Sequence, residues 1–201
     1  MRMNRDFAIT RETMMILPNY TNGELRSLVC RTDKYVEVAK PPYQLIDYNL
    51  LYRGTSLRGA MEGSNDVLGK ITMHPIIIDY DHEIILFPCK SPFRKDCIWF
   101  SLRHVYATEG LKNKQTLVTL SNGSTIVVDI SLETFENKLR KAYELRFKMD
   151  VRRELGLLDE LAMDTPYHLF KATNGVNYEE KAGLTLSFST KMDYKKSRSK
   201  K

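Results

Sequence analysis

The sequence is poor in cysteine, histidine and glycine. Its three cysteines form no CxxC pair, and an odd number in a chain of 201 residues argues against a disulfide framework. Its four histidines have neither HxH nor HExxH spacing. We therefore expect reduced, mostly buried thiols and no metal site. Ten glycines and seven prolines are also too few for a collagen-like or wholly disordered chain.

Long hydrophobic runs are also missing. A membrane-spanning helix needs about 18 consecutive apolar residues. The longest apolar candidates, residues 76–78 and 84–87, are separated by Asp79, Asp81 and Glu83. The charged residues 1–6 are not followed by the apolar segment of a secretory signal. We therefore expect a cytoplasmic protein with no membrane partner.

Recognisable catalytic motifs are absent as well. No Ser/His/Asp or Cys/His set has the spacing of an enzyme family. Residues 54–59 (Gly-Thr-Ser-Leu-Arg-Gly) lack both the GxGxxG and the GK[ST] patterns of phosphate-binding loops. We expect no enzymatic activity and no cofactor. Residues 54–59 are interpreted as a structural turn.

Positive charge is concentrated in two places. The formal net charge is +6, and residues 191–201 supply +5 of it through six basic residues and one aspartate. Residues 90–114 carry a local charge of +4, with aromatic side chains among the cations. This pattern is typical of a nucleic-acid surface or of an ordinary solvated face. The candidate DNA-binding residues in it are Lys90, Arg94, Lys95, Arg103, His104, Lys112 and Lys114. For His104 the alternative is a hydrogen-bonded histidine at the end of a strand.

Residues 14–130 are expected to form strands joined by turns. Asn-Gly pairs at 22–23 and 122–123 lie between apolar or β-branched runs, and each pair predicts a hairpin. A third hairpin is predicted from the runs 76–78 and 84–87. The alternation around Trp99 favours a core position for its side chain. The fold class is therefore α+β, with a largely antiparallel β body.

At Ser131 the apolar period changes from two to between three and four. Ser131 is a suitable N-cap, and an amphipathic helix is predicted from Ser131 to Val151. The apolar stripe of this helix is Phe135, Leu139, Ala142, Leu145 and Met149. A shorter second helix is predicted from Arg153 to Met163, followed by an edge strand at 184–188 and a disordered basic tail. The predicted organisation is a folded body (1–152) and a variable, partly disordered C-terminal extension (153–201).

A collinear set of short motifs resembles the ComK family, the competence transcription factors of Gram-positive bacteria. The motifs are Pro42-Tyr43-Gln44-Leu45-Ile46-Asp47, Gly54-Thr55-Ser56 with Gly59, Gly63 and Ser64, Lys70-Ile71-Thr72, Pro75-Ile76, Ile78-Asp79, Ile84, Leu86-Phe87-Pro88, Cys97, Trp99-Phe100-Ser101, His104-Val105, Leu120-Ser121-Asn122-Gly123, Phe135-Glu136-Asn137, and Leu145-Arg146 with Lys148. No single motif is specific, but their order and spacing over residues 14–150 are.

The resemblance implies a transcriptional activator of DNA-uptake genes. Family members bind paired A/T-rich boxes in double-stranded DNA largely through the minor groove, form dimers that pair on DNA, and are delivered by an adaptor to the Clp protease. Where relatives have Gly-Arg in the glycine-rich loop, this chain has Gly59-Ala60. A loop contact to DNA is therefore assigned to Arg53 and Arg58. Adaptor docking is assigned to Tyr167, Leu169 and Phe170, and packing of the last two against the helix is the alternative.

Two other functions remain open from the sequence. One is a non-activating interaction module, or a competence factor inactivated by its altered C-terminus. The other is a single-stranded nucleic-acid binder that stacks bases on Trp99, Phe100 and Tyr106.

Overall fold

The structure is a computed structural model that describes residues 8–70, 72–162, 169–173, 175–176 and 178–180. The chain divides into two units, Met1–Glu154 and Leu155–Lys201. The expected edge strand at 184–188 and the basic tail lie outside the described residues.

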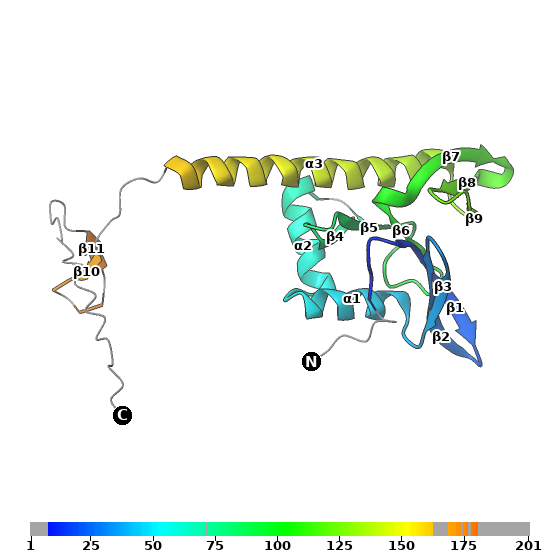
Figure 1. Cartoon of the computed structure of the whole chain (residues 1–201), viewed down its shortest axis with the longest axis horizontal. Coiled ribbons are helices and arrows are strands. Elements are labelled where there is room, and N and C mark those ends of the chain that lie inside the picture. Colours follow the sequence, from blue (N-terminus) through cyan, green and yellow to red (C-terminus); the bar gives the residue numbers. More distant parts are fainter. Residues whose placement is uncertain (1–7, 71, 163–168, 174, 177, 181–201) are drawn as a thin grey trace, which may run out of the picture. The chain divides into compact units, whose positions relative to one another are not determined.

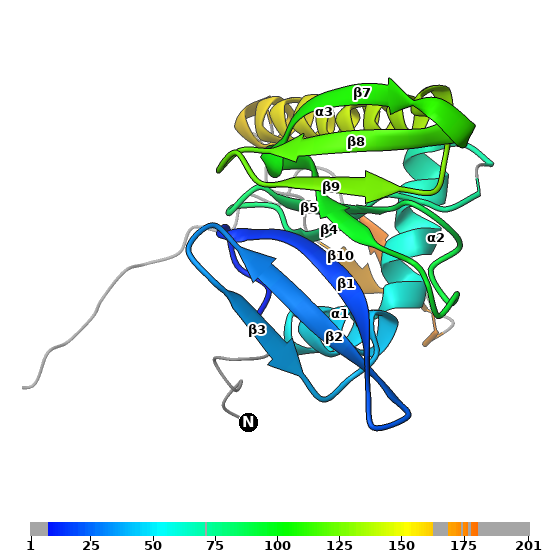
Figure 2. The same ribbon diagram turned by 90° about the vertical axis from the view of Figure 1, so that its right-hand side faces the viewer.

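A six-stranded antiparallel sheet forms the centre of the first unit (Figure 2). Its strands are β1 (Thr13–Thr21), β2 (Glu24–Arg31), β3 (Tyr35–Val38), β4 (Ile76–Asp79), β5 (Ile84–Pro88) and β6 (Trp99–Ser101). Their order across the sheet is β3-β2-β1-β6-β5-β4. The predicted hairpins β1–β2 and β4–β5 are confirmed. Asn22 and Gly23 both adopt positive φ (53° and 81°), as a two-residue turn of this kind requires.

Two helices that the sequence reading missed lie between β3 and β4. These are α1 (Pro42–Tyr52) and α2 (Leu57–Leu68). Pro42 is the first residue of α1, where its missing N–H is not needed, so it starts a helix here. The Ser56 hydroxyl caps α2 by accepting a hydrogen bond from the Gly59 amide (3.0 Å). Residues 54–59 are therefore the connection between two helices and the first turn of α2.

Alternation along the central strands produces two hydrophobic clusters, one on each face of the sheet. Ile16, Leu86 and Trp99 belong to one cluster, together with apolar residues of α1 and α2. Their sequence neighbours Met15, Phe87 and Phe100 belong to the other. Because adjacent strand residues point to opposite faces, one short strand contributes to both cores. Trp99 has no exposed surface, which confirms its predicted core position.

The second cluster is covered by a three-stranded sheet and a long helix. The sheet contains β7 (Val105–Leu111), β8 (Gln115–Leu120) and β9 (Thr125–Val128), in that order. The short helical turns η2 (Leu102–His104) and η3 (Lys112–Lys114) precede and follow β7. The predicted β8–β9 hairpin is confirmed, although only Gly123 in its turn has positive φ. Figures 1 and 2 show this sheet beside helix α3 (Leu132–Ala162), whose Phe135 ring packs edge-on against Phe87 and Phe100.

Helix α3 is continuous where the sequence predicted two helices. No proline lies within it, and the single glycine, Gly156, costs about 1 kcal/mol without ending a helix. Its predicted stripe is confirmed at Phe135, Ala142 and Leu145, which are buried. Several polar contacts also join α3 to other elements of the first unit. They join Arg146 to Glu83, Asp150 to Tyr80, Arg152 to Asp66, Arg153 to Asp81, and Lys148 to the Val67 carbonyl.

In the second unit, strands β10 (Leu169–Lys171) and β11 (Tyr178–Glu180) form an antiparallel pair. Over the described parts of both units, no helix combines the length and apolar character needed to cross a bilayer. Within the same residues, no group of three or more His, Cys, Asp or Glu side chains is placed to hold a metal ion.

Candidate nucleic-acid interface

The two arginines assigned to the glycine-rich loop have different surroundings. Arg53 donates to the Asp79 carboxylate (Nε–Oδ2 3.3 Å) and to the Asn49 carbonyl (3.2 Å), so it joins the end of α1 to the end of β4. Arg58 lies on α2, where its largely exposed side chain pairs with Glu62 one turn later (2.8 Å). Arg53 is thus a structural tie, and Arg58 remains the exposed cation of this region.

The turn between β5 and β6 contains three of the predicted DNA contacts. Lys90 and Arg94 both bind the Asp96 carboxylate, each at 2.8 Å. The hydrogen bonds from Arg94 and then Lys90 hold the pKa of Asp96 well below its ordinary range. Lys95 is exposed and makes no ion pair with any residue that the structure describes. Much of the positive charge read from this segment is therefore compensated locally.

Arg103 and His104 follow β6, and both side chains have partners within the protein. Arg103 pairs with Glu83 (2.7 Å), a carboxylate that also binds Arg146 of α3. His104 is buried, and its two ring nitrogens lie 2.6 Å from the Ser121 hydroxyl and 2.6 Å from the Arg11 carbonyl oxygen. The structure places His104 in the interior as a satisfied histidine, the alternative that the sequence left open.

The last two predicted contacts lie at the tip of the β7–β8 hairpin. Lys112 and Lys114 are exposed, and over the described parts of the chain neither forms an ion pair. Asn113 and Lys114 adopt left-handed φ values of 60° and 58°, which makes this tip a tight turn. Tyr106 on β7 is 79% exposed. The hairpin thus presents two available ammonium groups on a narrow element.

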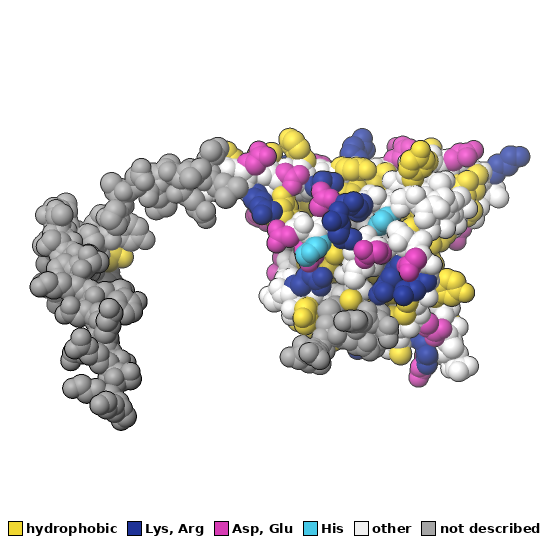
Figure 3. Space-filling model, viewed as in Figure 1, with side chains coloured by type: hydrophobic (Ala, Val, Ile, Leu, Met, Phe, Trp, Pro, Cys, Tyr) yellow, Lys and Arg dark blue, Asp and Glu magenta, His cyan; other side chains and the backbone are white. Residues whose placement is uncertain are grey.

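The nine predicted DNA-binding residues are spread over several elements of the first unit. They come from the end of α1, the start of α2, the β5–β6 turn, the η2 turn and the β7–β8 tip. The β5–β6 turn lies beside α1, because Phe93 packs edge-on against Tyr43 at 5.9 Å. The β7–β8 tip instead follows Gly110, which lies against Leu132 at the start of α3. On the face that Figure 3 shows, acidic and basic side chains are interleaved.

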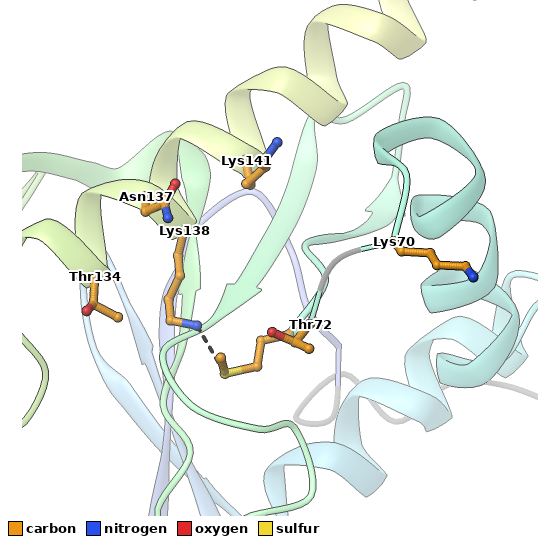
Figure 4. A pocket seen from close by; sticks show the side chains of 7 residues that line it. Lys70, Thr72, Thr134, Asn137, Lys138 and Lys141 are labelled. Carbon is orange, nitrogen blue, oxygen red and sulfur yellow. Dashed lines mark hydrogen bonds between the residues drawn. The ribbon is translucent and has the colours of Figure 1, made fainter.

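A basic pocket between α3 and the segment before β4 was not anticipated (Figure 4). It has a volume of about 530 Å³. Its lining residues are Lys70, Thr72, Met73, Thr134, Asn137, Lys138 and Lys141. Lys138 reaches from α3 into it, and its amine lies 3.1 Å from the Met73 sulfur. Burial lowers the pKa of Lys138. No feature of the helix pattern distinguished this lysine from its neighbours.

A second unpredicted surface is the outward face of α3. Tyr143 (50% exposed), Phe147 (68%) and Val151 (37%) recur every four residues and therefore share one side of the helix. Arg140 and Glu154 are also exposed and lie close to the same side. The sequence contained a sign of this face, because Tyr143, Phe147 and Val151 form a second apolar stripe with a spacing of four residues, beside the stripe that packs into the core.

The stacking residues of the single-stranded alternative are not available. Trp99 and Phe100 have no exposed surface, and only Tyr106 is accessible. Alternation around β6 places both rings inside, one on each face of the central sheet. Their burial argues against the alternative of a single-stranded nucleic-acid binder that stacks bases on Trp99 and Phe100.

The predicted adaptor-docking residues fall in the second unit. Tyr167 lies outside the described residues. Leu169 is 54% exposed and Phe170 is half-buried, and both belong to β10, where Phe170 is in register with Glu179 of β11. Leu169 and Phe170 are therefore part of a paired strand in the second unit.

Comparison with known proteins identifies the family. A family model described as ComK protein matches residues 4–154. The competence transcription factor of Bacillus subtilis (strain 168) is 31% identical over 146 residues, which cover 73% of this chain and 76% of the relative. No solved structure matches. The chain belongs to the ComK family of competence transcription factors, a family of transcriptional regulators and not of enzymes.

Proposed function

We propose that this chain binds A/T-rich boxes in double-stranded DNA, mainly through the minor groove, and thereby activates genes for DNA uptake. The observation that carries the proposal is the family match over residues 4–154, which includes the whole first unit apart from its first three residues. This activity takes place in the cytoplasm, the location expected from the sequence.

The β7–β8 tip is our first choice for the element that meets DNA. A-tract minor grooves are narrow and strongly negative, and proteins read them with inserted basic side chains. Lys112 and Lys114 supply two exposed ammonium groups without an acidic partner among the described residues. The hairpin that carries them is a narrow element. Shape and charge together support entry into a groove of this kind.

Arg58 and Lys95 are proposed as contacts to the DNA backbone. Both side chains are exposed, and the single ion pair of Arg58 is a surface pair within one helix. Such pairs are worth less than about 1 kcal/mol and exchange readily for a phosphate. Lys90, Arg94 and Arg103 would each have to leave a carboxylate first. We therefore expect them to contribute less to DNA affinity.

The outward face of α3 is proposed as the surface that joins two copies of this chain. Tyr143 and Val151 lie four residues before and four residues after Phe147 in the sequence. Arg140 and Glu154 lie seven residues before and seven after it. In an antiparallel pair of helices with its two-fold axis at Phe147, each Arg140 therefore faces the partner's Glu154. The apolar centre and the charged ends of this face therefore both match the same face of a second copy, as a two-fold interface requires.

A mobility-shift experiment at one stated salt concentration tests the DNA-binding proposal. The probes are a duplex with two spaced A/T boxes, a G/C duplex of equal length and a single strand. We expect tight binding to the A/T duplex only. Equal affinity for the G/C duplex would rule out box recognition, and preference for the single strand would rule out duplex binding.

The non-activating alternative rests on residues 155–201, which lie outside the family match. A chain of this kind binds the boxes, or pairs with a complete relative, without raising transcription. A transcription measurement separates it from the activator.

A further inference from the structure

We propose that the pocket around Lys138 is a binding site for a phosphate group. The inference starts from the composition of its lining. Three lysines, two threonines and one asparagine surround it, and no aspartate or glutamate is among the lining residues. All of these polar side chains present hydrogen-bond donors, and the ammonium groups attract an anion.

Lys138 is the central residue of the site. It is the lysine whose side chain enters the pocket from α3 in Figure 4. The other charged α3 side chains that point toward the first unit, such as Arg146 and Arg152, meet carboxylates. Lys138 instead lies 3.1 Å from the thioether sulfur of Met73, and the buried thiols of Cys89 and Cys97 are near enough to interact with its charge. It forms no ion pair with a carboxylate among the described residues. A half-buried ammonium without an acidic partner destabilises the fold unless an anion compensates it.

The segment opposite α3 is held in an uncommon conformation. Met73 adopts φ = 57°, the left-handed region that a residue with a long side chain rarely occupies. Such strain is maintained only where the surrounding structure requires it, and it is concentrated at functional sites. In this conformation of Met73, its sulfur lies beside the Lys138 amine. Thr72 and Lys70, which precede Met73, line the same pocket (Figure 4).

The remaining donors are arranged around Lys138. On α3, Thr134 lies four residues before Lys138 and Lys141 three residues after it, so both share its side of the helix. Asn137 lies three residues after Thr134 and four before Lys141, at the edge of the same side. Lys141 is bound to Glu144 (2.7 Å), and Lys70 is exposed with no ion pair among the described residues. Both lie at the edge of the pocket, where their flexible side chains are able to turn toward a bound anion. A volume of about 530 Å³ accommodates a phosphate together with the atoms attached to it.

Two sources of phosphate fit this chemistry: a backbone phosphate of DNA, or free phosphate and small phosphorylated molecules. The first source rests on the proposed function, and the second does not. Low polarity around a half-buried ammonium strengthens its attraction for either one. The two sources are separated by measurements with and without DNA.

The first measurement uses the full chain, inorganic phosphate and no DNA. The melting temperature is compared in phosphate and in chloride at equal ionic strength and pH, for the wild type and for Lys138→Met and Lys70→Met. Lys34→Met is the matched control, because Lys34 is exposed and lies on the β2–β3 turn. Phosphate stabilises proteins in general, and this nonspecific rise in melting temperature is common to all variants. We expect an additional rise in the wild type and in Lys34→Met, a smaller one in Lys70→Met and none in Lys138→Met.

The second measurement is the salt dependence of binding to the A/T duplex. If a DNA phosphate enters the pocket, Lys138→Met reduces the slope of log K against log[salt] by about 0.9, the value of one contact, and Lys34→Met leaves it unchanged. A response to phosphate with an unchanged slope assigns the pocket to free phosphate. If the wild type does not bind DNA, the proposed function fails and the first measurement alone judges the pocket. Wild-type behaviour of Lys138→Met and Lys70→Met in both measurements would overturn the proposal.

Discussion

His104 is hydrogen-bonded through Nε2 to the carbonyl oxygen of Arg11, 2.6 Å away and ninety-three residues earlier in the chain. A carbonyl only accepts, so Nε2 donates this hydrogen bond, and Nδ1 is hydrogen-bonded to the Ser121 hydroxyl at 2.6 Å. The ring thus ties the start of β7 to the segment before β1. His104, which was predicted to contact DNA, therefore has a structural role.

Replacing His104 by Ala therefore tests stability and not recognition. The change removes a buried side chain and leaves the Arg11 carbonyl and the Ser121 hydroxyl, both on exposed residues, without the ring as a partner. Each lost hydrogen bond costs about 0.5–1.5 kcal/mol. We expect a lower free energy of unfolding in a urea titration and an unchanged affinity for the A/T duplex per folded molecule. A loss of affinity in a variant of wild-type stability would instead return His104 to the DNA interface.

The β7–β8 tip gives the sharpest test of the proposed contact surface. Lys112→Ala with Lys114→Ala removes two exposed cations that have no acidic partner in the described structure. We expect weaker binding to the A/T duplex, a salt slope smaller by up to about 1.8, and the same melting temperature as the wild type. The matched control is Lys90→Ala with Arg94→Ala, which also removes two charges, but from a site where Asp96 already neutralises part of them. A larger loss in the control would place the interface at the β5–β6 turn.

Self-association through α3 is tested by exchanging charges. Arg140→Glu alone and Glu154→Arg alone each place like charges opposite one another in the proposed antiparallel pair, and we expect both to shift the chain toward the monomer in sedimentation equilibrium. The double variant restores opposite charges and is expected to restore the dimer. Three variants with the same oligomeric state as the wild type would show that this face is not the interface.

Acid should weaken the ion pairs on α3 in a defined pH range. Hydrogen bonds from Lys141 and then Lys148 hold the pKa of Glu144 at about 2, compared with an ordinary 4.5. A carboxyl with a lowered pKa stabilises the fold above its unfolded pKa, and this contribution is lost as the pH falls from 4.5 toward 2. Glu144→Gln is therefore expected to lower the free energy of unfolding slightly at pH 7, by less than about 1 kcal/mol, because these ion pairs lie at the surface and are partly exposed. The difference from the wild type should shrink below pH 4.5. A difference that is independent of pH would assign it to packing.

Recognition by a Clp adaptor remains a prediction for Leu169 and Phe170. Their place on β10 allows the exposed Leu169 to contact a partner. Leu169→Ala with Phe170→Ala is expected to abolish adaptor-dependent degradation in a reconstituted assay and to leave DNA binding intact. Equal degradation of wild type and variant rules out this segment, and a loss of DNA binding shows that the two side chains are structural.

The hairpins were predictable from sequence, whereas two of the helices were not identified. Asn22, Gly23 and Gly123 adopt the positive φ values that Asn and Gly favour, so the signal for both turns is local in the sequence. Helices α1 and α2 carry proline and glycine at positions that a local reading takes as breaks. Burial of Leu45, Ile46 and Leu57 against the central sheet stabilises them despite this composition. The spacing of Leu45, Asn49 and Leu50 was the available sign of a helix, and all three are buried.

The candidate site was harder to predict because partners of charges are set by tertiary structure. The pairing of Arg94 with Asp96 is local, but Arg103 meets Glu83 from a different strand pair, and sequence gives no sign of it. The same limit concealed Lys138. Its special surroundings come from Met73, sixty-five residues away.

The most direct test of the central claim is transcription from a promoter that carries two A/T boxes. The chain is expressed in a DNA-uptake bacterium that lacks its own competence factor, and messenger RNA from a DNA-uptake gene is measured with intact boxes and with boxes replaced by G/C sequence. We predict a rise in transcript that requires the intact boxes. No rise, in cells where the protein accumulates and occupies the boxes, would contradict activation and favour the non-activating alternative.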